Sequence, residues 1–433
     1  MNEDCCVDPF KCWAVARAAT VVLLCASWAE AEASPCSTAI GRDELVPCAL
    51  RASVAAEAQV HALEASRARE TAVSPLLPSN PVLSATLGRR SIPGGVRTSN
   101  WSASLSQEVE IAGQRGARQR AAQAEVSAEL SRLRLSRREV AVQAWERYFE
   151  ALAAREEVAL TTRLAAAAQA LSNVVSAKAE QGLLAPVDAD VTDARLSRDL
   201  QAKFAAERHQ SAALSALTSL LGGDPRSQPL TVSGELTPLA VDRLLGSASE
   251  AQRERPEIAA AEAERQAWQM RADAYRRSRV PNPTLSVYVE DDGFNEHVFG
   301  AGLSIPIPLP GNVGRTYQGE IAESEALAQR AVSEGAAVRR SVRLEVASAW
   351  QAYESRRREV SVLTPEKARR AAQTLDDLRA EVQAGRLPVR DALVAQQALV
   401  EFLQNELSAR LELCLASVAL ARALGFPLER RLP

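Results

Sequence analysis

The sequence predicts a mainly α-helical chain with two membrane-type β-hairpins and an internal two-fold repeat. Two very long segments, residues 115–180 and 315–382, place apolar residues at helical spacing. Two shorter segments, residues 81–110 and 283–307, alternate apolar and polar side chains as strands do. Three motifs recur in the same order about 200 residues apart, which indicates a duplication.

The composition narrows the class of protein. Of the 433 residues, 47% are hydrophobic and 24% are charged, which excludes a disordered chain. Aromatic residues make up only 4%, whereas alanine is abundant, and this favours closely packed helices over a conventional globular core. The net charge is -3, and no basic patch carries interleaved aromatic residues, so we expect no nucleic-acid partner.

Residues 1–33 are predicted to be a signal peptide. Lys11 precedes an apolar run at residues 18–28, and small residues precede a plausible cleavage site before Ser34. The apolar run is too short for a membrane-spanning helix. The acidic start is atypical, so a start codon downstream of Met1 stays open, and "VLLC" ending at Cys25 leaves lipidation as an alternative.

Three of the seven cysteines follow the predicted signal peptide. An oxidising compartment permits a disulfide between Cys36 and Cys48, and two unpaired thiols are the alternative. Cys414 lies between two leucines on a predicted helix and is expected to be packed in the core.

The repeat is visible in three pairs of motifs. They are "SNP" at residues 79–81 with "PNP" at 281–283, "AWERY" at 144–148 with "AWQAY" at 349–353, and "QGLLAPVDA" from Gln181 with "AGRLPVRDA" from Ala384. We therefore expect a first repeat at residues 34–221, a linker at 222–255 that straps around the outside, and a second repeat at 256–433.

Each repeat is predicted to have the same order of elements. The first contains a helix at 43–71, a hairpin at about 81–110, a long helix at 115–180, a tip at 181–188 and a return helix to 221. The second contains a helix at 256–279, a hairpin at about 283–307, a long helix at 315–382, a tip at 384–390 and a return helix at 389–424. Pro365 should kink or divide the second long helix, and a glycine followed by a proline ends one helix and starts the next at each tip.

The strands are about the length that crosses a bilayer with tilt. Trp101, Ala103 and Leu105, for example, share one face, and serines occupy the other. A soluble sheet with one hydrated face is the alternative. Four strands cannot close a barrel, because open edges leave backbone groups unpaired in lipid. Three chains of four strands would give twelve.

These motifs resemble the TolC-like outer-membrane efflux proteins. The "NP" before each first strand, the duplicated "AW" helices and the two tips carry the resemblance, and "AGLSIPIPLPGNVGRTYQGEIAESEAL" is most similar to the CzcC-type branch that serves heavy-metal efflux. The resemblance implies a homotrimer, with a twelve-stranded outer-membrane β-barrel continuous with a periplasmic α-helical barrel. It also implies contact with outer-membrane lipid, a periplasmic adaptor (membrane fusion) protein and an inner-membrane RND-type pump.

The function implied by the resemblance is a passive exit channel for heavy-metal cations. An exit duct for multidrug efflux or type I protein secretion is the alternative within this class. A secreted coiled-coil scaffold without a pore is the alternative from another class, although it would not need two hairpins of membrane-crossing length.

No residues suggest catalysis or a cofactor. The sequence lacks nucleophile and phosphate-binding motifs, so we expect that the protein is not an enzyme. His61, His209 and His297 are far apart and outside any metal-ligand spacing, so no metal site is expected.

The resemblance places the tips at the periplasmic mouth, where relatives carry rings of acidic residues. Asp391 falls at the first acidic position when one inserted residue is allowed, but Val394 occupies the second. Arg390 could pair with Asp188 or Asp190 of a neighbouring tip. The alternative is that Asp188 and Asp391 cap the N-termini of their helices.

The tips are also the expected docking sites for the adaptor. Their residues are Gly182, Leu183, Leu184, Pro186, Gly385, Arg386, Leu387 and Pro388. The three leucines are expected to gain little from their own chain. The loops at residues 91–99 and 291–297 should face the exterior, with Trp101 and Phe299 near the outer membrane interface.

Overall fold

The computed structural model describes residues 36, 39–91, 93–95, 97–224, 230–241, 255–292, 296–309, 311 and 313–428. The predicted signal peptide and the motif at Cys25 lie outside these residues, as do parts of the predicted linker and of the two predicted exterior loops. Residues 38–433 form one compact unit.

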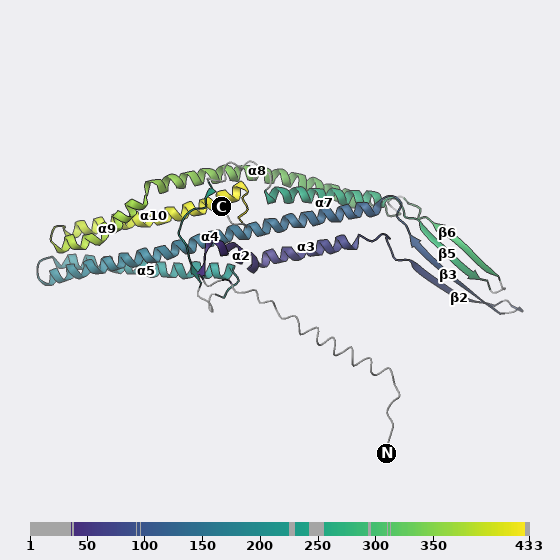
Figure 1. The fold of residues 1–433 in the computed structure, drawn as a ribbon, viewed down its shortest axis with the longest axis horizontal. Helices are drawn as coiled ribbons and strands as arrows, with labels where there is room; N and C mark the ends of the chain where they lie inside the picture. The colour runs from purple at the N-terminus through teal and green to yellow at the C-terminus, as the bar shows by residue number, and fades with distance from the viewer. Residues whose placement is uncertain are drawn as a thin grey trace, which may run out of the picture. The chain divides into compact units, whose positions relative to one another are not determined.

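Long helices dominate this unit (Figure 1). They are α2 (Arg42–Ala52), α3 (Val54–Ala72), α4 (Gln114–Glu180), α5 (Pro186–Leu220), α7 (Pro256–Ser278), α8 (Gln318–Val362), α9 (Pro365–Gln383) and α10 (Val389–Leu424). With 67 residues, α4 spans about 100 Å at 1.5 Å per residue. No helix within the described ranges is long and apolar enough to cross a membrane.

Helix α4 is the spine against which the other helices pack. Helices α3 and α7 lie along the half nearer the sheet, α5 returns along the other half, and α10 contacts α4, α8 and α9 (Figure 1). Alanine provides much of the buried surface of α4, including Ala141, Ala144, Ala151 and Ala154, which are fully buried. These short side chains let neighbouring helices approach closely, as the alanine-rich composition suggests.

Two predicted helices are divided. The helix expected over residues 315–382 is two helices, because α8 ends at Val362 and α9 begins at Pro365, which cannot donate the hydrogen bond that would continue α8. The Thr364 side chain caps α9 by accepting from the Lys367 backbone N–H at 3.4 Å. The helix expected over 43–71 is divided at Ser53, whose hydroxyl caps α3.

The two hairpins form one antiparallel sheet of four strands. These are β2 (Val82–Arg90), β3 (Thr98–Glu108), β5 (Thr284–Asp291) and β6 (His297–Ser304), in the order β2-β3-β5-β6. The hairpins meet where β3 pairs with β5. Strand β6 ends at Ser304, earlier than the predicted hairpin boundary at 307, since Pro306 has no N–H to extend the ladder.

The described part of the predicted linker packs against the helices. Strand β4 (Thr231–Val232) pairs in parallel with β1 (Ala39–Ile40). The Tyr148 hydroxyl of α4 donates to the Ser233 carbonyl at 2.5 Å, and the same hydroxyl leaves no room for a side chain at Gly234, whose φ is 118°. The Leu239 N–H donates to the Ser417 hydroxyl of α10 at 3.0 Å. The linker is therefore fixed to both α4 and α10.

A buried ionic cluster joins four helices near this linker. Arg255 is almost fully buried and bonds Glu257 of α7 and Glu345 of α8, while Arg138 of α4 also reaches Glu257. Arg255 further donates to the carbonyl of Ala423 near the end of α10 at 3.0 Å. Burial disfavours the charged form of Arg255, but its two carboxylate partners outweigh burial and raise its pKa.

Candidate functional site

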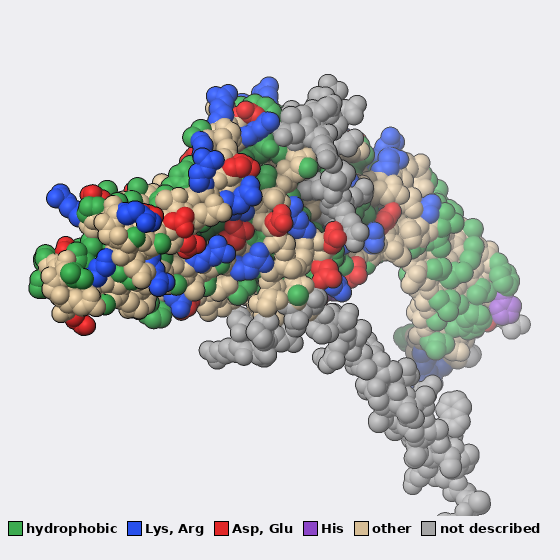
Figure 2. Space-filling view, turned by 60° about the vertical axis from the view of Figure 1, so that its left-hand side comes forward, with side chains coloured by type: hydrophobic (Ala, Val, Ile, Leu, Met, Phe, Trp, Pro, Cys, Tyr) green, Lys and Arg blue, Asp and Glu red, His purple; other side chains and the backbone are tan. Residues whose placement is uncertain are grey.

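One face of the sheet is apolar and exposed. The register places Leu83 opposite Leu105, and Leu105 opposite Val287. Leu87 is 86% exposed and Phe299 is 79% exposed, although both lie on this face of a regular sheet. Figure 2 shows hydrophobic side chains gathered over the sheet. A continuous apolar surface of this kind indicates a partner that is itself apolar.

The opposite face carries small and polar residues. Ser104 lies between Ser84 and Tyr288 in the register, and Ser286 lies opposite Gly302. The Tyr288 side chain lies over Gly300, where an added Cβ would come within 2.4 Å of its hydroxyl. The sheet thus separates an apolar side from a polar side, as the alternation predicts.

The two tips are tight turns at the other end of the helices. Gly182 and Gly385 adopt left-handed φ values of 72° and 74°, which favour glycine. In the first tip, the Leu183 N–H donates to the Lys178 carbonyl at 2.9 Å. In the second tip, the Arg386 N–H donates to the Glu381 carbonyl at 3.0 Å. These bonds satisfy carbonyls that the helix ends would otherwise leave unpaired.

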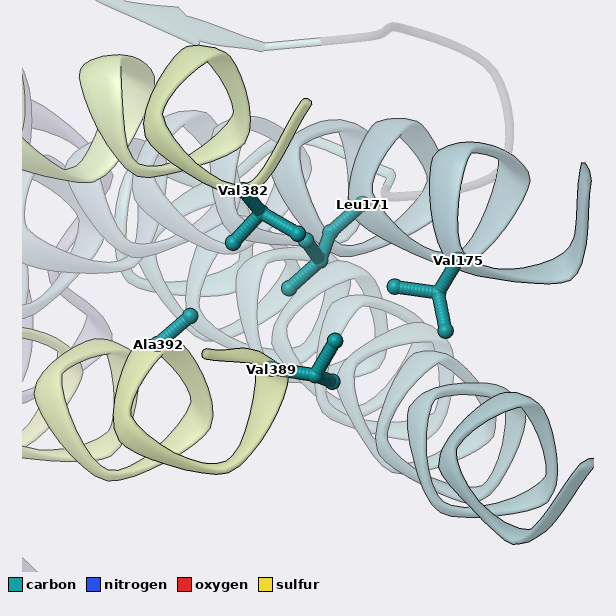
Figure 3. Close-up of a cluster of buried hydrophobic side chains, with 5 residues drawn as sticks. All are labelled: Leu171, Val175, Val382, Val389 and Ala392. Atoms are coloured by element: carbon teal, nitrogen blue, oxygen red, sulfur yellow. The ribbon is translucent and has the colours of Figure 1, made fainter. Parts of the chain in front are cut away.

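A hydrophobic cluster holds the two tips together (Figure 3). Its buried members are Leu171, Val175, Val382, Val389 and Ala392, from α4, α9 and α10.

Two leucines of the predicted docking set pack against this tip cluster. Leu184 and Leu387 are partly buried on it, so the expectation that they gain little from their own chain is wrong. The reason is that both leucines pack against a cluster to which α4, α9 and α10 all contribute. Leu183, by contrast, is 66% exposed and remains available.

Polar contacts reinforce the tip cluster. The Lys178 ammonium group donates to the carbonyls of Val382 and Gln383, both at 2.9 Å, at the C-terminal end of α9. A cation at this end of a helix is favoured by unpaired carbonyls and by the helix dipole. Arg386 forms an exposed bidentate salt bridge with Glu381, with hydrogen bonds of 2.7 and 2.6 Å, and these bonds lower the pKa of Glu381.

The predicted gate residues lie close to the tips. Asp391, Arg390 and Asp190 are exposed, and Asp188 is half-buried. Within the described part of one chain, Arg390 forms no ion pair with Asp188 or Asp190.

The predicted N-cap role of the two aspartates is wrong, but both lie near the positive end of their helices, as predicted. The N-cap residues are Ala185 and Pro388, neither with a side-chain cap, so Asp188 and Asp391 lie inside the first turn. Helix α5 starts earlier than predicted, at Pro186, whose fixed φ suits the first helical position, and α10 starts at Val389.

A groove of about 750 Å³ lies above the tip cluster, between α4, α9 and α10. Its lining includes Leu160, Leu375 and Leu403 together with Glu406 and Arg410. Burial raises the pKa of Glu406, although the Arg410 charge opposes this shift. Across the described residues, no cluster of histidine, cysteine and carboxylate side chains could hold a metal ion.

The structure bears on the predictions made for the three cysteines. Cys36 and Cys48 are each disulfide-bonded, and Cys414 is a buried free thiol. The pairing of Cys36 with Cys48 stays a prediction.

The family model for outer membrane efflux proteins matches residues 51–223 and 248–426, which is most of the chain. The chain belongs to this family. The TolC-like resemblance is thereby confirmed. This is an outer-membrane protein with a large periplasmic helical part.

Solved structures share the fold. A membrane protein from Pseudomonas aeruginosa is 22% identical with a TM-score of 0.72, over 89% of this chain and 91% of that chain. CusC, whose structures describe transmembrane channel formation, is 18% identical with a TM-score of 0.70, over 88% and 91%. The open MtrE channel of Neisseria gonorrhoeae is 19% identical with a TM-score of 0.69, over 89% of each chain.

A curated relative matches a shorter region. Protein CyaE of Bordetella pertussis is 28% identical over 263 residues, which are 57% of this chain and 56% of CyaE. The match therefore spans about half the length of that relative.

Proposed function

We propose that this protein is the exit channel of a tripartite efflux system, assembled as a homotrimer whose three sheets close one twelve-stranded barrel. The observation that carries the proposal is the exposed apolar face of an open four-stranded sheet. Lipid would cover that face, but the edges β2 and β6 would leave backbone groups unpaired in a bilayer. Three copies joined edge to edge would remove both edges and continue into a tube of helices.

The test of this assembly uses the purified full-length protein. Extraction from outer membranes should yield a trimer by native mass spectrometry, and planar-bilayer recordings should show a conducting pore. A monomer that retains its full β content in detergent contradicts the proposal. A protein without conductance supports the scaffold alternative instead.

The proposed substrate class is heavy-metal cations, with an RND-type pump in the inner membrane as the energy source. The support is the CzcC-type sequence around "SIPIPL". A strain that lacks the gene should become sensitive to zinc, cobalt or cadmium, and a plasmid copy should restore resistance. Sensitivity to dyes and detergents alone, or loss of a secreted protein alone, would instead favour the multidrug or type I secretion alternatives.

The proposed adaptor surface is an apolar stripe at the first tip. Val187 and Val191 are exposed and one turn apart, so they share one side of α5, and Leu183 is exposed in the turn that leads into this helix. Leu183→Asp should abolish efflux without changing the amount of trimer. Leu184→Asp is the matched control in the same turn, because it should instead loosen the tip cluster. Unchanged resistance in Leu183→Asp would exclude this stripe as the docking site.

The proposed gate is a ring of three Asp391 side chains, one from each copy, with Arg390, Asp188 and Asp190 nearby. Three converging carboxylates repel one another, and bound cations would offset that repulsion. Since Asp391 is not the N-cap of α10, Asp391→Asn removes charge without removing a side-chain cap. Block by divalent cations added from the periplasmic side should weaken in this variant. Unaltered block would remove Asp391 from the gate.

A further inference from the structure

Four connectors join the sheet to the helices, and they expose large apolar side chains. The connectors are residues 73–81, 109–113, 279–283 and 305–317. Each carries at least one exposed apolar residue; examples are Leu76, Ile111, Val280 and Ile307. Ile307 is 80% exposed, as much as the residues on the apolar face of the sheet. Exposed apolar surface therefore extends from the sheet to the start of the helices.

Three arginines, here called the connector arginines, are tied to these stretches through backbone carbonyls. Arg115 of α4 donates to two carbonyls of the first connector, at 2.7 and 3.0 Å. Arg277 of α7 donates to the Ala112 carbonyl at 3.3 Å. Arg279, directly after α7, donates to the Thr316 carbonyl at 3.2 Å. Each guanidinium group is therefore held where a helix meets the sheet.

No carboxylate neutralises the connector arginines within the described part of the chain. Neighbouring arginines differ in this respect, because Arg118 pairs with Glu110 and Arg276 pairs with Glu325. Glu108, the last residue of β3, lies on the polar face of the sheet and accepts from the Asn282 side chain instead. Unneutralised positive charge thus lies directly beside exposed apolar surface.

Helix dipoles do not account for this arrangement. Arg277 lies in the last turn of α7, where the dipole favours a cation. Arg115, however, is the second residue of α4, at the positive end of the helix, where a cation is disfavoured. Its carbonyl bonds fix the side chain but supply no full negative charge. An external anion would supply it for all three connector arginines.

Two tyrosines lie beside the connector arginines. The rings of Tyr275 in α7 and Tyr317 stack with their centroids 6.2 Å apart, and the Arg315 guanidinium lies 4.7 Å from the Tyr317 ring centroid. Tyr317 follows Thr316, whose carbonyl accepts from Arg279, and has a φ of 55° that is uncommon outside glycine. Tyrosine is enriched where a membrane meets water, the boundary that the apolar connectors and the arginines also indicate.

We propose that Arg115, Arg277 and Arg279 bind the phosphate groups of anionic phospholipids in the periplasmic leaflet of the outer membrane, with the apolar connectors among the acyl chains above them. This inference rests on the proposed placement of the sheet in the bilayer. A guanidinium group matches a phosphate with two parallel hydrogen bonds. The carbonyl bonds already order these side chains, which lowers the entropy that lipid binding costs. Bound lipid would hold the channel at a fixed depth.

Thermal unfolding in lipid nanodiscs tests the proposal. The purified full-length protein is placed in nanodiscs of phosphatidylcholine alone, or of equal parts phosphatidylcholine and phosphatidylglycerol. Phosphatidylglycerol should raise the unfolding temperature of the parent protein. The triple variant Arg115→Gln/Arg277→Gln/Arg279→Gln should lose most of this rise, because glutamine removes the charge and keeps an amide donor. A full rise in this variant would overturn the proposal.

The matched control removes the same charge elsewhere. Arg340→Gln/Arg343→Gln/Arg370→Gln changes three exposed arginines of α8 and α9 that lie away from the connectors and form no ion pair within the described chain. This variant should keep the rise given by phosphatidylglycerol. An equal loss in both triple variants would mean that net charge alone attracts the lipid, and would overturn the assignment to the connector arginines.

The parent protein provides a test that needs no variant. Added salt should reduce the rise given by phosphatidylglycerol, because it screens exposed charges. A rise that does not depend on salt, or an equal rise on adding inorganic phosphate to phosphatidylcholine nanodiscs, would overturn anionic lipid as the ligand.

These outcomes are separate from those of the proposed function. Loss of the lipid effect would leave the channel proposal standing. Absence of conductance in planar bilayers would overturn the channel proposal, and it would leave the unfolding temperatures in the two kinds of nanodisc unchanged.

Discussion

Val175→Ala tests whether the tip cluster holds the two tips together. Val175 is fully buried on α4 and lies against side chains of α9 and α10 (Figure 3). The change removes two methyl groups, worth about 1.6 kcal/mol at about 0.8 kcal/mol per carbon, and leaves a small cavity that adds to the loss. We expect the free energy of local opening to fall by about 2 kcal/mol, which is roughly a 30-fold increase in the open population.

Amide hydrogen exchange, followed by mass spectrometry on the trimer, measures this opening. Peptides from residues 171–184 and 381–393 should exchange roughly 30-fold faster in Val175→Ala, because exchange there reports local opening. Val394→Ala is the matched control, since Val394 is 66% exposed and is not part of the cluster, although it lies only two residues after Ala392. Equal exchange in the two variants would refute the idea that the cluster joins the tips.

Three further predictions concern single charged groups. Burial raises the pKa of Glu406, so its ionised form costs free energy in the folded state, and Glu406→Gln should raise the thermal unfolding temperature at pH 7. Although burial opposes it, pairing with Arg255 and Arg138 lowers the pKa of Glu257. The contribution of ionised Glu257 to the free energy of unfolding is therefore complete above the ordinary carboxyl pKa and is lost as pH falls through the lowered value. Glu257→Gln should remove this contribution and so flatten the acid side of a plot of unfolding temperature against pH. Lys178→Met should speed amide exchange in the last turn of α9 several-fold while leaving α8 unchanged.

The periodic parts of the fold can be predicted from the sequence. The side-chain period of two puts Leu83, Ala85 and Leu87 on one face whatever the strand's partner is, so the apolar face follows from alternation alone. The division before Pro365 likewise follows from a missing N–H. The division at Ser53 has no such signal, because a serine within a helix and a serine that caps one look alike in sequence.

The tips could be located from the sequence, but their contacts could not. The glycine and proline spacing places both turns, whereas burial of Leu184 and Leu387 depends on two turns about 200 residues apart meeting in space. The bond from Lys178 to the end of α9 depends on the same meeting. Helical periodicity shows that a residue lies on the buried side, but it does not show which helix covers it.

The packing of α10 suits a channel of the proposed kind, whose tips would separate while the helices above them stay packed. Beyond the tip cluster, the buried side of α10 reaches Gln396, whose amide oxygen and nitrogen are buried without a partner in the described chain. Such a group costs free energy, so this turn adds little to the attachment of α10. The next apolar contact, of Val400 with Leu164 and Leu375, lies one turn further on. Separation of the tips in the proposed gate would break the tip cluster and the Lys178 bonds, and the weak turn at Gln396 lies between these contacts and the packing above them.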